Sequence, residues 1–250
     1  MTARDDRGEP APMPRYEPLE RLRVRRPASR DAFLREACRG RRVLDLGAMD
    51  ETAYRSKRGT GMWIHEEIAK VAAEVTGLDS STLVPAEGLR TAPNAVILRA
   101  DITRISSWFA SRDATPDPDI VVAGEVIEHL PDPLAFLREL RSVDRLRGRR
   151  LVLTTPNATA VHNVLVGMLS RESTHHDHLC ILSYKTLHTL LHRAGFARWT
   201  LTPYYAAFPE MRSRHPGLAG LAIGAGERSI NAIEWLFPLL SFGWVVDAEL

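Results

Sequence analysis

Two carboxylates and an imidazole lie within one stretch of five residues, Glu125-Val126-Ile127-Glu128-His129. The stretch follows the apolar run 120–123, and Pro131 comes shortly after it. If the chain makes one helical turn here, the i, i+3 and i+4 spacing places all three side chains on one face. Two anions held this close together need a proton, a cation or a metal ion. The stretch therefore predicts a divalent-metal site.

Acidic residues also mark the ends of three expected strands. The apolar runs 42–47, 74–78 and 95–98 have the pattern of buried strands, and Asp45, Asp79 and Asp101 stand at or just after their ends. A doubly wound sheet places such ends along one edge, where ligands bind. Each aspartate alone is more commonly a turn or cap residue. Their joint placement favours a ligand with an ammonium, a ribose diol and an adenine amino group. Each of these groups can donate a hydrogen bond to a carboxylate.

The elements needed to position these residues follow from the rest of the pattern. Further strands are expected at 120–123 and 151–155, with helices at 29–38, 63–72, 133–140, 161–168 and 183–195. This alternation predicts an α/β fold with a doubly wound, mostly parallel sheet. Segments 196–202 and 243–248 could close it as an antiparallel pair. Residues 206–236 would then be an insertion that could form a lid.

Length and composition predict one domain. Residues 1–18 contain four prolines among charges and indicate a flexible lead-in, so that 19–250 would form the domain. The net charge of +2 implies no strong field for nucleic acid or membranes. An arginine-rich segment is interpreted as a solvated, poorly ordered arm rather than a binding site; its members are Arg21, Arg23, Arg25, Arg26 and Arg30.

Cysteine usage and the absence of a hydrophobic leader indicate a cytoplasmic protein. Cys38 and Cys180 have neither zinc-binding neighbours nor a disulfide framework, so both are expected to be reduced. No N-terminal signal peptide is evident, and the most apolar segment, 235–246, is too short to span a bilayer.

Over roughly residues 40–200 the chain resembles the class I S-adenosylmethionine-dependent methyltransferases. Their motifs are matched, in order, by Val43-Leu44-Asp45-Leu46-Gly47, Thr76-Gly77-Leu78-Asp79, Arg99-Ala100-Asp101-Ile102, Asp119-Ile120-Val121 with Glu128-His129-Leu130, Leu153-Thr154-Thr155-Pro156-Asn157 and the segment 191–196. The resemblance implies a Rossmann-like, seven-stranded sheet that ends in an antiparallel strand at 243–248. It also implies S-adenosylmethionine as the cofactor.

The same resemblance assigns roles to individual residues. Asp45 and Gly47 would face the methionine end of the cofactor, Asp79 the ribose hydroxyls, and Asp101 with Ile102 the adenine; Glu125 would also line the cofactor site. The first motif departs from the family's D-x-G-x-G pattern, because Met49 stands where the second glycine is usual and Glu51 where a third can occur. The absence of G-x-G-x-x-G argues against a nicotinamide oxidoreductase.

A second resemblance concerns the metal. Metal-dependent small-RNA 2′-O-methyltransferases and ubiquinone-biosynthesis O-methyltransferases carry a similar E-x-x-E-H turn. The resemblance to the small-RNA enzymes implies four metal ligands, Glu125, Glu128, His129 and His178. The resemblance to the ubiquinone enzymes instead places His176 in the position of His178. The mixed oxygen and nitrogen set suits Mn²⁺, Co²⁺ or Zn²⁺ better than Mg²⁺. Methyltransferases of class I that bind no metal also resemble the chain at residues 128–130. In that alternative the turn only shapes the loop over the cofactor.

Other residues offer weaker signals. Trp63 and His65 could flank the methionine end, although a core aromatic and a solvated histidine are the commoner interpretation. Tyr204, Tyr205 and His215 could line a substrate pocket or simply pack the lid.

The sequence thus predicts a methyltransferase that methylates a hydroxyl of a small molecule such as a sugar or natural product. Glu128 and His129 are the candidate catalytic residues, because a metal contacting a hydroxyl lowers its pKa. RNA is the second choice of acceptor. A metal-independent N- or O-methyltransferase and a non-catalytic binding protein on the same scaffold remain alternatives.

Overall fold

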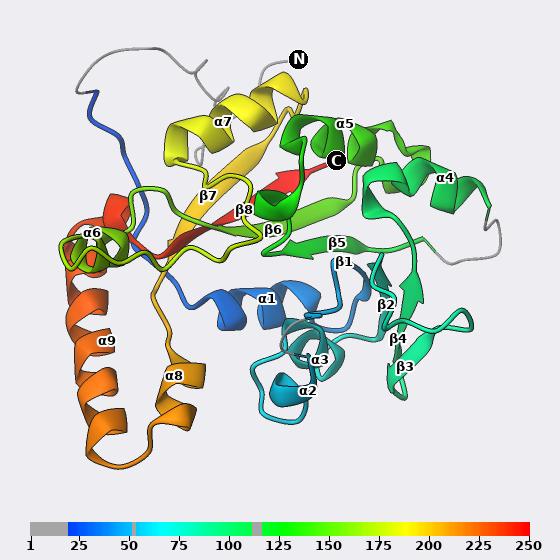
Figure 1. Cartoon of the computed structure of the whole chain (residues 1–250). Coiled ribbons are helices and arrows are strands. Elements are labelled where there is room, and N and C mark those ends of the chain that lie inside the picture. The colour runs from blue at the N-terminus through cyan, green and yellow to red at the C-terminus, as the bar shows by residue number, and fades with distance from the viewer. Residues whose placement is uncertain (1–19, 52–53, 112–116) are drawn as a thin grey trace.

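Eight strands form one sheet in the computed structural model, which describes residues 20–51, 54–111 and 117–250 (Figure 1). The expected lead-in, 1–18, lies outside these ranges. The strands are β1 (Arg42–Leu46), β2 (Glu74–Asp79), β3 (Leu89–Ala92), β4 (Ala95–Arg99), β5 (Ile120–Gly124), β6 (Arg150–Pro156), β7 (Trp199–Tyr204) and β8 (Gly243–Glu249).

The strand order is β3-β4-β2-β1-β5-β6-β8-β7. Neighbours from β4 to β6 pair in parallel, whereas β8 and β7 pair antiparallel at one end. This confirms the predicted doubly wound sheet with its antiparallel C-terminal strand. The sheet has one strand more than expected, because β3 pairs antiparallel with β4 at the opposite edge. Its four residues, Leu-Arg-Thr-Ala, are only partly buried and give little periodic signal.

Helices cover both faces of the sheet. The α-helices are α1 (Arg30–Cys38), α2 (Tyr54–Lys57), α3 (Ile64–Ala69), α4 (Ile105–Ala110), α5 (Pro133–Ser142), α6 (Val161–Gly167), α7 (Tyr184–Arg193), α8 (Pro209–Arg214) and α9 (Leu218–Leu236). Short 3₁₀ helices are η1 (Ile102–Arg104), η2 (Ile127–His129), η3 (Asp144–Leu146) and η4 (Pro238–Leu240). Ser29, Asp132 and Ser183 accept backbone hydrogen bonds at the starts of α1, α5 and α7, as helix caps do.

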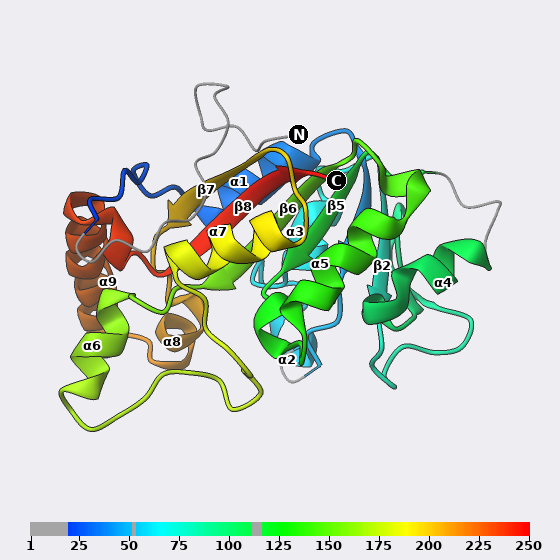
Figure 2. The ribbon, with the colours of Figure 1, turned by 90° about the horizontal axis from the view of Figure 1, so that it is seen from above.

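The strands are apolar on both sides because a separate hydrophobic cluster lies on each face. On one face, Leu44 and Leu46 of β1 join the cluster that includes residues of α4, α5 and α7. On the other, Val43 of β1 joins residues of α1 and α3. Figures 1 and 2 show α4, α5 and α7 together on one side of the sheet, with α1 to α3 on the other.

The chain winds outward from β1 in two directions, first to β2 and β4 and later to β5 and β6. The switch point therefore lies between the carboxyl ends of β1 and β5. Open α/β sheets bind ligands at such a point. The expected aspartates and the 125–129 turn all lie along this edge.

The predicted insertion, 206–236, follows β7 in the sequence and precedes β8. It forms α8 and α9, which lie beside the sheet (Figure 1). Glu234 of α9 is fully buried, and its carboxylate accepts a hydrogen bond from the backbone N–H of Ala206 at 2.9 Å. The ammonium of Lys57 bridges the carboxylates of Asp50 and Glu210, at 2.6 and 2.9 Å. The insertion is thereby joined to the loop after β1.

Two residues of the expected arginine arm have specific places, contrary to the interpretation from sequence. The guanidinium of Arg26 stacks on Trp235, 4.3 Å from the ring centre. Arg30 begins α1, and its side chain reaches the site described below. Cys38 and Cys180 are unpaired thiols, as expected. Within the described ranges, no helix has the length and apolar character needed to cross a bilayer.

Candidate functional site

A cleft of about 590 Å³ opens at the carboxyl edge of the sheet. This volume is typical of a small-molecule site. The cleft is lined by most of the residues predicted from sequence, namely Asp45, Gly47, Asp79, Asp101, Ile102, Glu125, His129 and His178. Glu128 is buried behind this lining. The cleft thus joins the expected cofactor residues to the expected metal turn.

The second aspartate, Asp79, is held by the loop after β1. Its carboxylate accepts hydrogen bonds from the backbone N–H groups of Met49 and Ser81, at 2.8 and 2.9 Å. Burial raises the pKa of Asp79 despite these two bonds. Each carboxylate oxygen keeps a lone pair, so the side chain can still accept from a diol.

The departure from the usual glycine motif is accommodated by the fold. The side chain of Met49 is buried, in a cluster with Trp63 and Val84. Its backbone N–H, rather than its side chain, faces Asp79. The carboxylate of Glu51 accepts a hydrogen bond from the hydroxyl of Ser81 at 2.7 Å. The non-glycine residues therefore stabilise the loop that crosses the strand ends.

Gly47, in contrast, occupies a position that only glycine fits. Its φ is +69°, in the left-handed region that favours glycine. A Cβ at this position would lie less than 3.0 Å from Cγ2 of Val126. The loop after β1 therefore packs directly on the segment that carries the metal turn.

The third aspartate, Asp101, caps η1. Its carboxylate accepts hydrogen bonds from the backbone N–H and the hydroxyl of Thr103, at 2.9 and 2.6 Å. The cap interpretation of this single residue is thus correct. Asp101 and the adjacent Ile102 nevertheless line the cleft together.

The first aspartate, Asp45, has a partner that sequence reasoning placed in solvent. His65 is 1 % exposed, and its Nδ1 lies 2.8 Å from Oδ2 of Asp45. Its Nε2 lies 2.8 Å from the hydroxyl of Thr91 in β3. The expectation of a solvated histidine was wrong, because α3 packs its first turn against the ends of β1 and β2. Trp63 is a buried core aromatic, as expected.

Glu128 lies at the centre of η2, in the turn predicted to bind a metal, and is 0 % exposed. Its Oε2 accepts a hydrogen bond from the hydroxyl of Thr155 at 3.0 Å, whereas Oε1 is buried and has no hydrogen-bond partner in the described structure. Burial, with a smaller contribution from the charge of Glu125, raises the pKa of Glu128 to about 9. An unpartnered buried carboxyl oxygen calls for a ligand or a proton.

Two histidines complete a group around this carboxylate. Donor atoms of Glu128, His129 and His178 all lie within 4.8 Å of one another. Nδ1 of His129 lies 3.2 Å from the backbone oxygen of Asp177, which can only accept, so this nitrogen carries the proton and Nε2 has a free lone pair. Nδ1 of His178 is buried without a hydrogen-bond partner in the described structure.

Burial also lowers the pKa of His178, with further contributions from His129 and His175. A neutral imidazole is the form that binds a metal. The structure brings His178, and not the alternative His176, to Glu128 and His129. His176 instead contacts the carboxylate of Asp177 at 3.1 Å on the exposed side of the loop.

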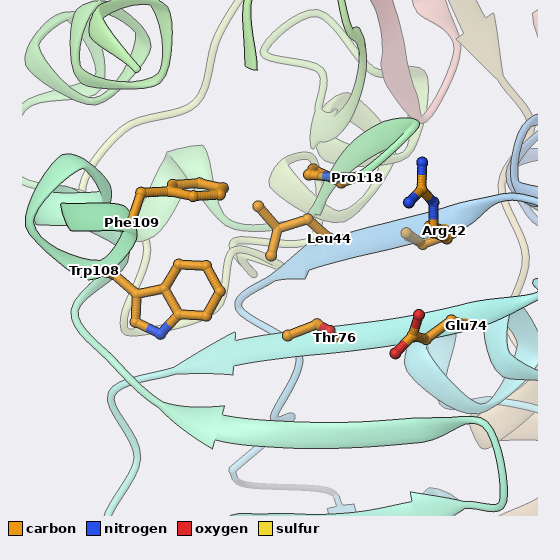
Figure 3. A pocket seen from close by; sticks show the side chains of 8 residues that line it. Arg42, Leu44, Glu74, Thr76, Trp108, Phe109 and Pro118 are labelled. Carbon is orange, nitrogen blue, oxygen red and sulfur yellow. The ribbon is translucent and has the colours of Figure 1, made fainter. Parts of the chain in front are cut away.

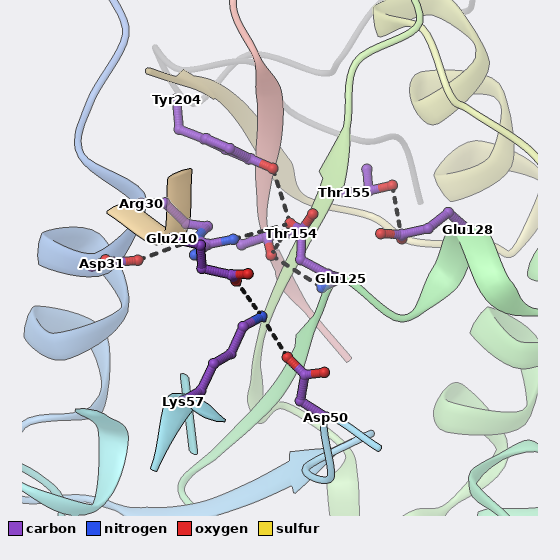
Figure 4. A network of polar contacts seen from close by, with 10 residues as sticks. All are labelled: Arg30, Asp31, Asp50, Lys57, Glu125, Glu128, Thr154, Thr155, Tyr204 and Glu210. Carbon is purple, nitrogen blue, oxygen red and sulfur yellow. Dashed lines mark hydrogen bonds and ion pairs between the residues drawn. The ribbon is translucent and has the colours of Figure 1, made fainter. Parts of the chain in front are cut away.

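Glu125 does not join the group, contrary to the expectation that one helical turn would align all three side chains. The turn, η2, begins only at Ile127, and Glu125 precedes it with a φ of +55°. Its Oε1 accepts hydrogen bonds from the hydroxyls of Thr154 and Tyr204, at 2.7 and 2.9 Å, and lies 3.7 Å from the guanidinium of Arg30. Figure 4 shows these side chains converging on Glu125 while Thr155 approaches Glu128.

A second hollow lies at the opposite end of the strands, between α4 and the first residues of β1 and β2 (Figure 3). Leu44, Thr76, Trp108 and Phe109 line it. Its volume of about 20 Å³ suffices for roughly one water molecule. This hollow contains none of the site residues predicted from sequence, whereas the large cleft is lined by most of them.

The fold and this edge of the sheet define a Rossmann-like methyltransferase, and comparison with known proteins agrees. Residues 19–201 match the family model described as a methyltransferase domain. The chain belongs to this family, which confirms the class I S-adenosylmethionine-dependent methyltransferase resemblance.

Individual relatives are more distant. The ubiquinone biosynthesis O-methyltransferase of Xanthomonas campestris pv. campestris (strain B100) is 30 % identical over 149 residues. The match covers 57 % of this chain, and the chain spans only 57 % of the length of that curated relative.

Similar chains occur among solved structures, and one with a TM-score above 0.5 shares the fold. The small RNA methyltransferase HEN1 superposes with a TM-score of 0.52 and 14 % identity, over 88 % of this chain and 25 % of that one. A SAM-dependent methyltransferase from Archaeoglobus fulgidus gives a TM-score of 0.48 and 17 % identity, over 88 % and 92 % of the two chains.

Proposed function

We propose that this protein transfers a methyl group from S-adenosylmethionine to a hydroxyl oxygen of a small molecule, with a divalent metal ion bound by Glu128, His129 and His178. One observation carries the proposal. Buried donor atoms of Glu128 and His178 have no partners in the described structure, and they lie next to a cleft lined by the cofactor motifs.

The chemistry of the three side chains fits a metal. A buried unpartnered polar atom costs about 1–3 kcal/mol, and a bound cation would offset that cost for each orphaned atom that it contacts. One carboxylate and two imidazoles form a mixed set that suits Mn²⁺, Co²⁺ or Zn²⁺ better than Mg²⁺. His129 is already oriented by the backbone of Asp177, as metal-binding histidines usually are by a second partner.

Glu125 is a further ligand only after a rearrangement. Its charge contributes to the raised pKa of Glu128, so the two carboxylates are close enough to interact. To reach a shared metal, Glu125 would exchange its hydrogen bonds with Thr154 and Tyr204. Its place in the ligand set stays a prediction.

The cofactor residues act on the other half of the cleft. Asp79 and Asp101 are held by loop N–H groups and present lone pairs for the ribose and adenine, while Asp45 and Gly47 border the methionine end. S-adenosylmethionine would supply an electrophilic methyl group. The metal, when bound, would lower the pKa of the acceptor hydroxyl and fix its oxygen. Val126 and Leu130, which are apolar, also line the cleft.

A small hydroxylated acceptor is favoured over RNA. The curated relative is by name an O-methyltransferase of ubiquinone biosynthesis, which supports transfer to a hydroxyl. The likeness to a small RNA methyltransferase, at 14 % identity, extends to the fold alone. The net charge of +2 supplies little of the attraction that RNA phosphates require.

Direct assay tests the proposal. The full chain is incubated with S-adenosylmethionine and a panel of catechols, sugars and RNA 3′ ends, with Mn²⁺ or with EDTA, and S-adenosylhomocysteine is measured. We expect turnover of a catechol or sugar that EDTA abolishes and Mn²⁺ restores. Turnover that EDTA leaves unchanged would refute the role of the metal ion. Methylation of RNA but of no small molecule would refute the proposed class of acceptor. Failure to bind S-adenosylmethionine, with Mn²⁺ or with EDTA, would indicate a non-catalytic protein.

A further inference from the structure

His65 is the buried titratable side chain nearest the cofactor motifs that the proposed chemistry does not use. It lies in the first turn of α3, with its side chain fully buried, and contacts Asp45 at 2.8 Å. Asp45 itself is only 3 % exposed but borders the cleft beside Gly47. Asp45 and His65 therefore both belong to the wall of the cofactor site.

The direction of the contact follows from the chemistry of its atoms. An ionised carboxylate can only accept hydrogen bonds, so Nδ1 of His65 carries a proton and donates to Oδ2 of Asp45. Nε2 faces the hydroxyl of Thr91, which can either donate to it or accept from it. In both cases the tautomer and the ring orientation are fixed at two points.

The surrounding structure leaves room for this ring and for little else. A Cβ on Gly77 of β2 would come within 3.1 Å of Cε1 of His65, so the absence of a side chain there makes space for the imidazole. On the other side the ring lies 5.1 Å from the ring of Trp63, whose indole N–H donates to the backbone oxygen of Ala48 at 2.9 Å. The imidazole is thus packed between a strand and the cofactor loop.

We infer that His65 is a positioning residue for the cofactor, which holds the Asp45 carboxylate so that its second oxygen accepts from the ammonium group of the methionine moiety. The inference rests on the cofactor placement of the proposed function, but not on the metal or the acceptor. Oδ2 is bonded to the imidazole, which leaves Oδ1 for a ligand in the cleft. Without the imidazole, the carboxylate would lose its fixed rotamer and a charged group would be left without its buried donor.

Two ligands separate this role from ordinary packing. S-adenosylhomocysteine carries the amino-acid moiety, whereas 5′-methylthioadenosine lacks it and retains the adenosine. Removing the ring by His65→Leu should weaken S-adenosylhomocysteine binding by at least about tenfold, the size of a lost charge-assisted hydrogen bond, and 5′-methylthioadenosine by less than about twofold. Isothermal titration calorimetry of the full chain without metal measures both.

Matched variants make the result specific. Asparagine can place an N–H near the position of Nδ1, so His65→Asn should bind S-adenosylhomocysteine within about threefold of the wild type. Thr91→Val, which removes only the far contact, should give an intermediate loss confined to the same ligand. His192→Leu in α7 makes the same change outside the cleft and should alter neither affinity. Circular dichroism melting of each variant confirms that it is folded.

The outcomes are distinguishable. Equal losses on both ligands, or a His65→Asn variant no better than His65→Leu, would overturn the positioning role and leave His65 as a packing residue. A wild-type chain that binds neither ligand would overturn the cofactor site of the proposed function, and the role of His65 with it. Loss of methyl transfer or of metal binding alone would leave the inference standing.

Discussion

The two halves of the cleft satisfy their polar groups in opposite ways. On the cofactor side, Asp79 accepts from two backbone N–H groups and Asp101 from Thr103. The other half of the cleft, around Glu128, His129 and His178, is where the proposed methyl acceptor would bind, and we call it the acceptor side. There, Glu128 and His178 each keep a buried polar atom without a hydrogen-bond partner in the described structure. The cofactor side is therefore complete without a ligand, whereas the acceptor side is not.

This difference has an energetic consequence. Acids that the loops already hold keep their orientation in the free protein, so binding the cofactor requires little rearrangement. Buried polar atoms without partners destabilise the free protein, and a ligand that satisfies these atoms stabilises the folded state. The two halves should therefore respond differently to substitution, to metal and to pH.

The largest expected effect tests the proposed metal site. Glu128→Ala or His129→Ala should weaken Mn²⁺ binding by more than about 100-fold, because losing even a group that only hydrogen-bonds to a metal ligand costs about 10- to 100-fold. Titration calorimetry with Mn²⁺ measures this loss. S-adenosylhomocysteine affinity should stay within about threefold of the wild type, since the cofactor side keeps its own partners.

His176→Ala is the matched control for these variants. His176 lies in the same loop as His178 but outside the group formed with Glu128. It should retain Mn²⁺ affinity. Loss of affinity in this variant as well would mean that the metal is held by the exposed loop rather than by the buried turn.

The next effect is steric, where the two halves meet. Gly47→Ala should destabilise the protein by about 2 kcal/mol or more, from the left-handed backbone and the contact with Val126 together. Gly40→Ala is the control: Gly40 has a similar φ of +66°, but a Cβ there would meet nothing within 4 Å. Urea denaturation measures both changes, and equal effects would show that backbone strain alone is responsible.

Neutralising a cofactor-side acid should have a smaller effect. Asp79→Asn should weaken the binding of S-adenosylhomocysteine by about tenfold, because a hydrogen bond to a charged carboxylate is lost. The affinity for Mn²⁺ should stay unchanged. Calorimetry with each ligand tests the two statements separately. A parallel loss of Mn²⁺ affinity would show that the two halves are not independent.

The smallest effect concerns pH. The pKa of Glu128 is raised by burial to about 9 from an ordinary value of 4.5, so over that range the folded metal-free protein binds more protons than the unfolded chain. Its stability should therefore fall as the pH rises through this window. Glu128→Gln, which cannot ionise, should remove that part of the slope, so that the metal-free variant is more stable than the wild type at pH 8. Urea denaturation from pH 5 to 9 measures the slope, and identical slopes would contradict the raised pKa.

The sequence predicted the elements whose signals are local. The parallel strands, the caps at Ser29, Asp132 and Ser183, and the placement of three aspartates at one edge all follow from apolar periodicity and short polar motifs. These features depend on neighbours in the chain, so periodicity suffices to find them.

What could not be predicted depends on contacts between distant segments. The partner of Asp45 is His65, 20 residues away, and only the packing of α3 on the strand ends reveals it. The direction of Glu125 depends on Tyr204, 79 residues away, and on where η2 begins. β3 was missed because four partly buried residues at a sheet edge carry little pattern.

The absent side chain at Gly47 also sets a spacing. The loop after β1 rests on Val126 so closely that a Cβ at Gly47 would clash with Cγ2 of Val126. Val126 directly precedes η2, which carries the catalytic candidates. Any larger group at either position would push the loop after β1 away from the segment that leads into η2. Redesign of the cleft should therefore begin at its other lining residues and keep Gly47 and Val126 unchanged.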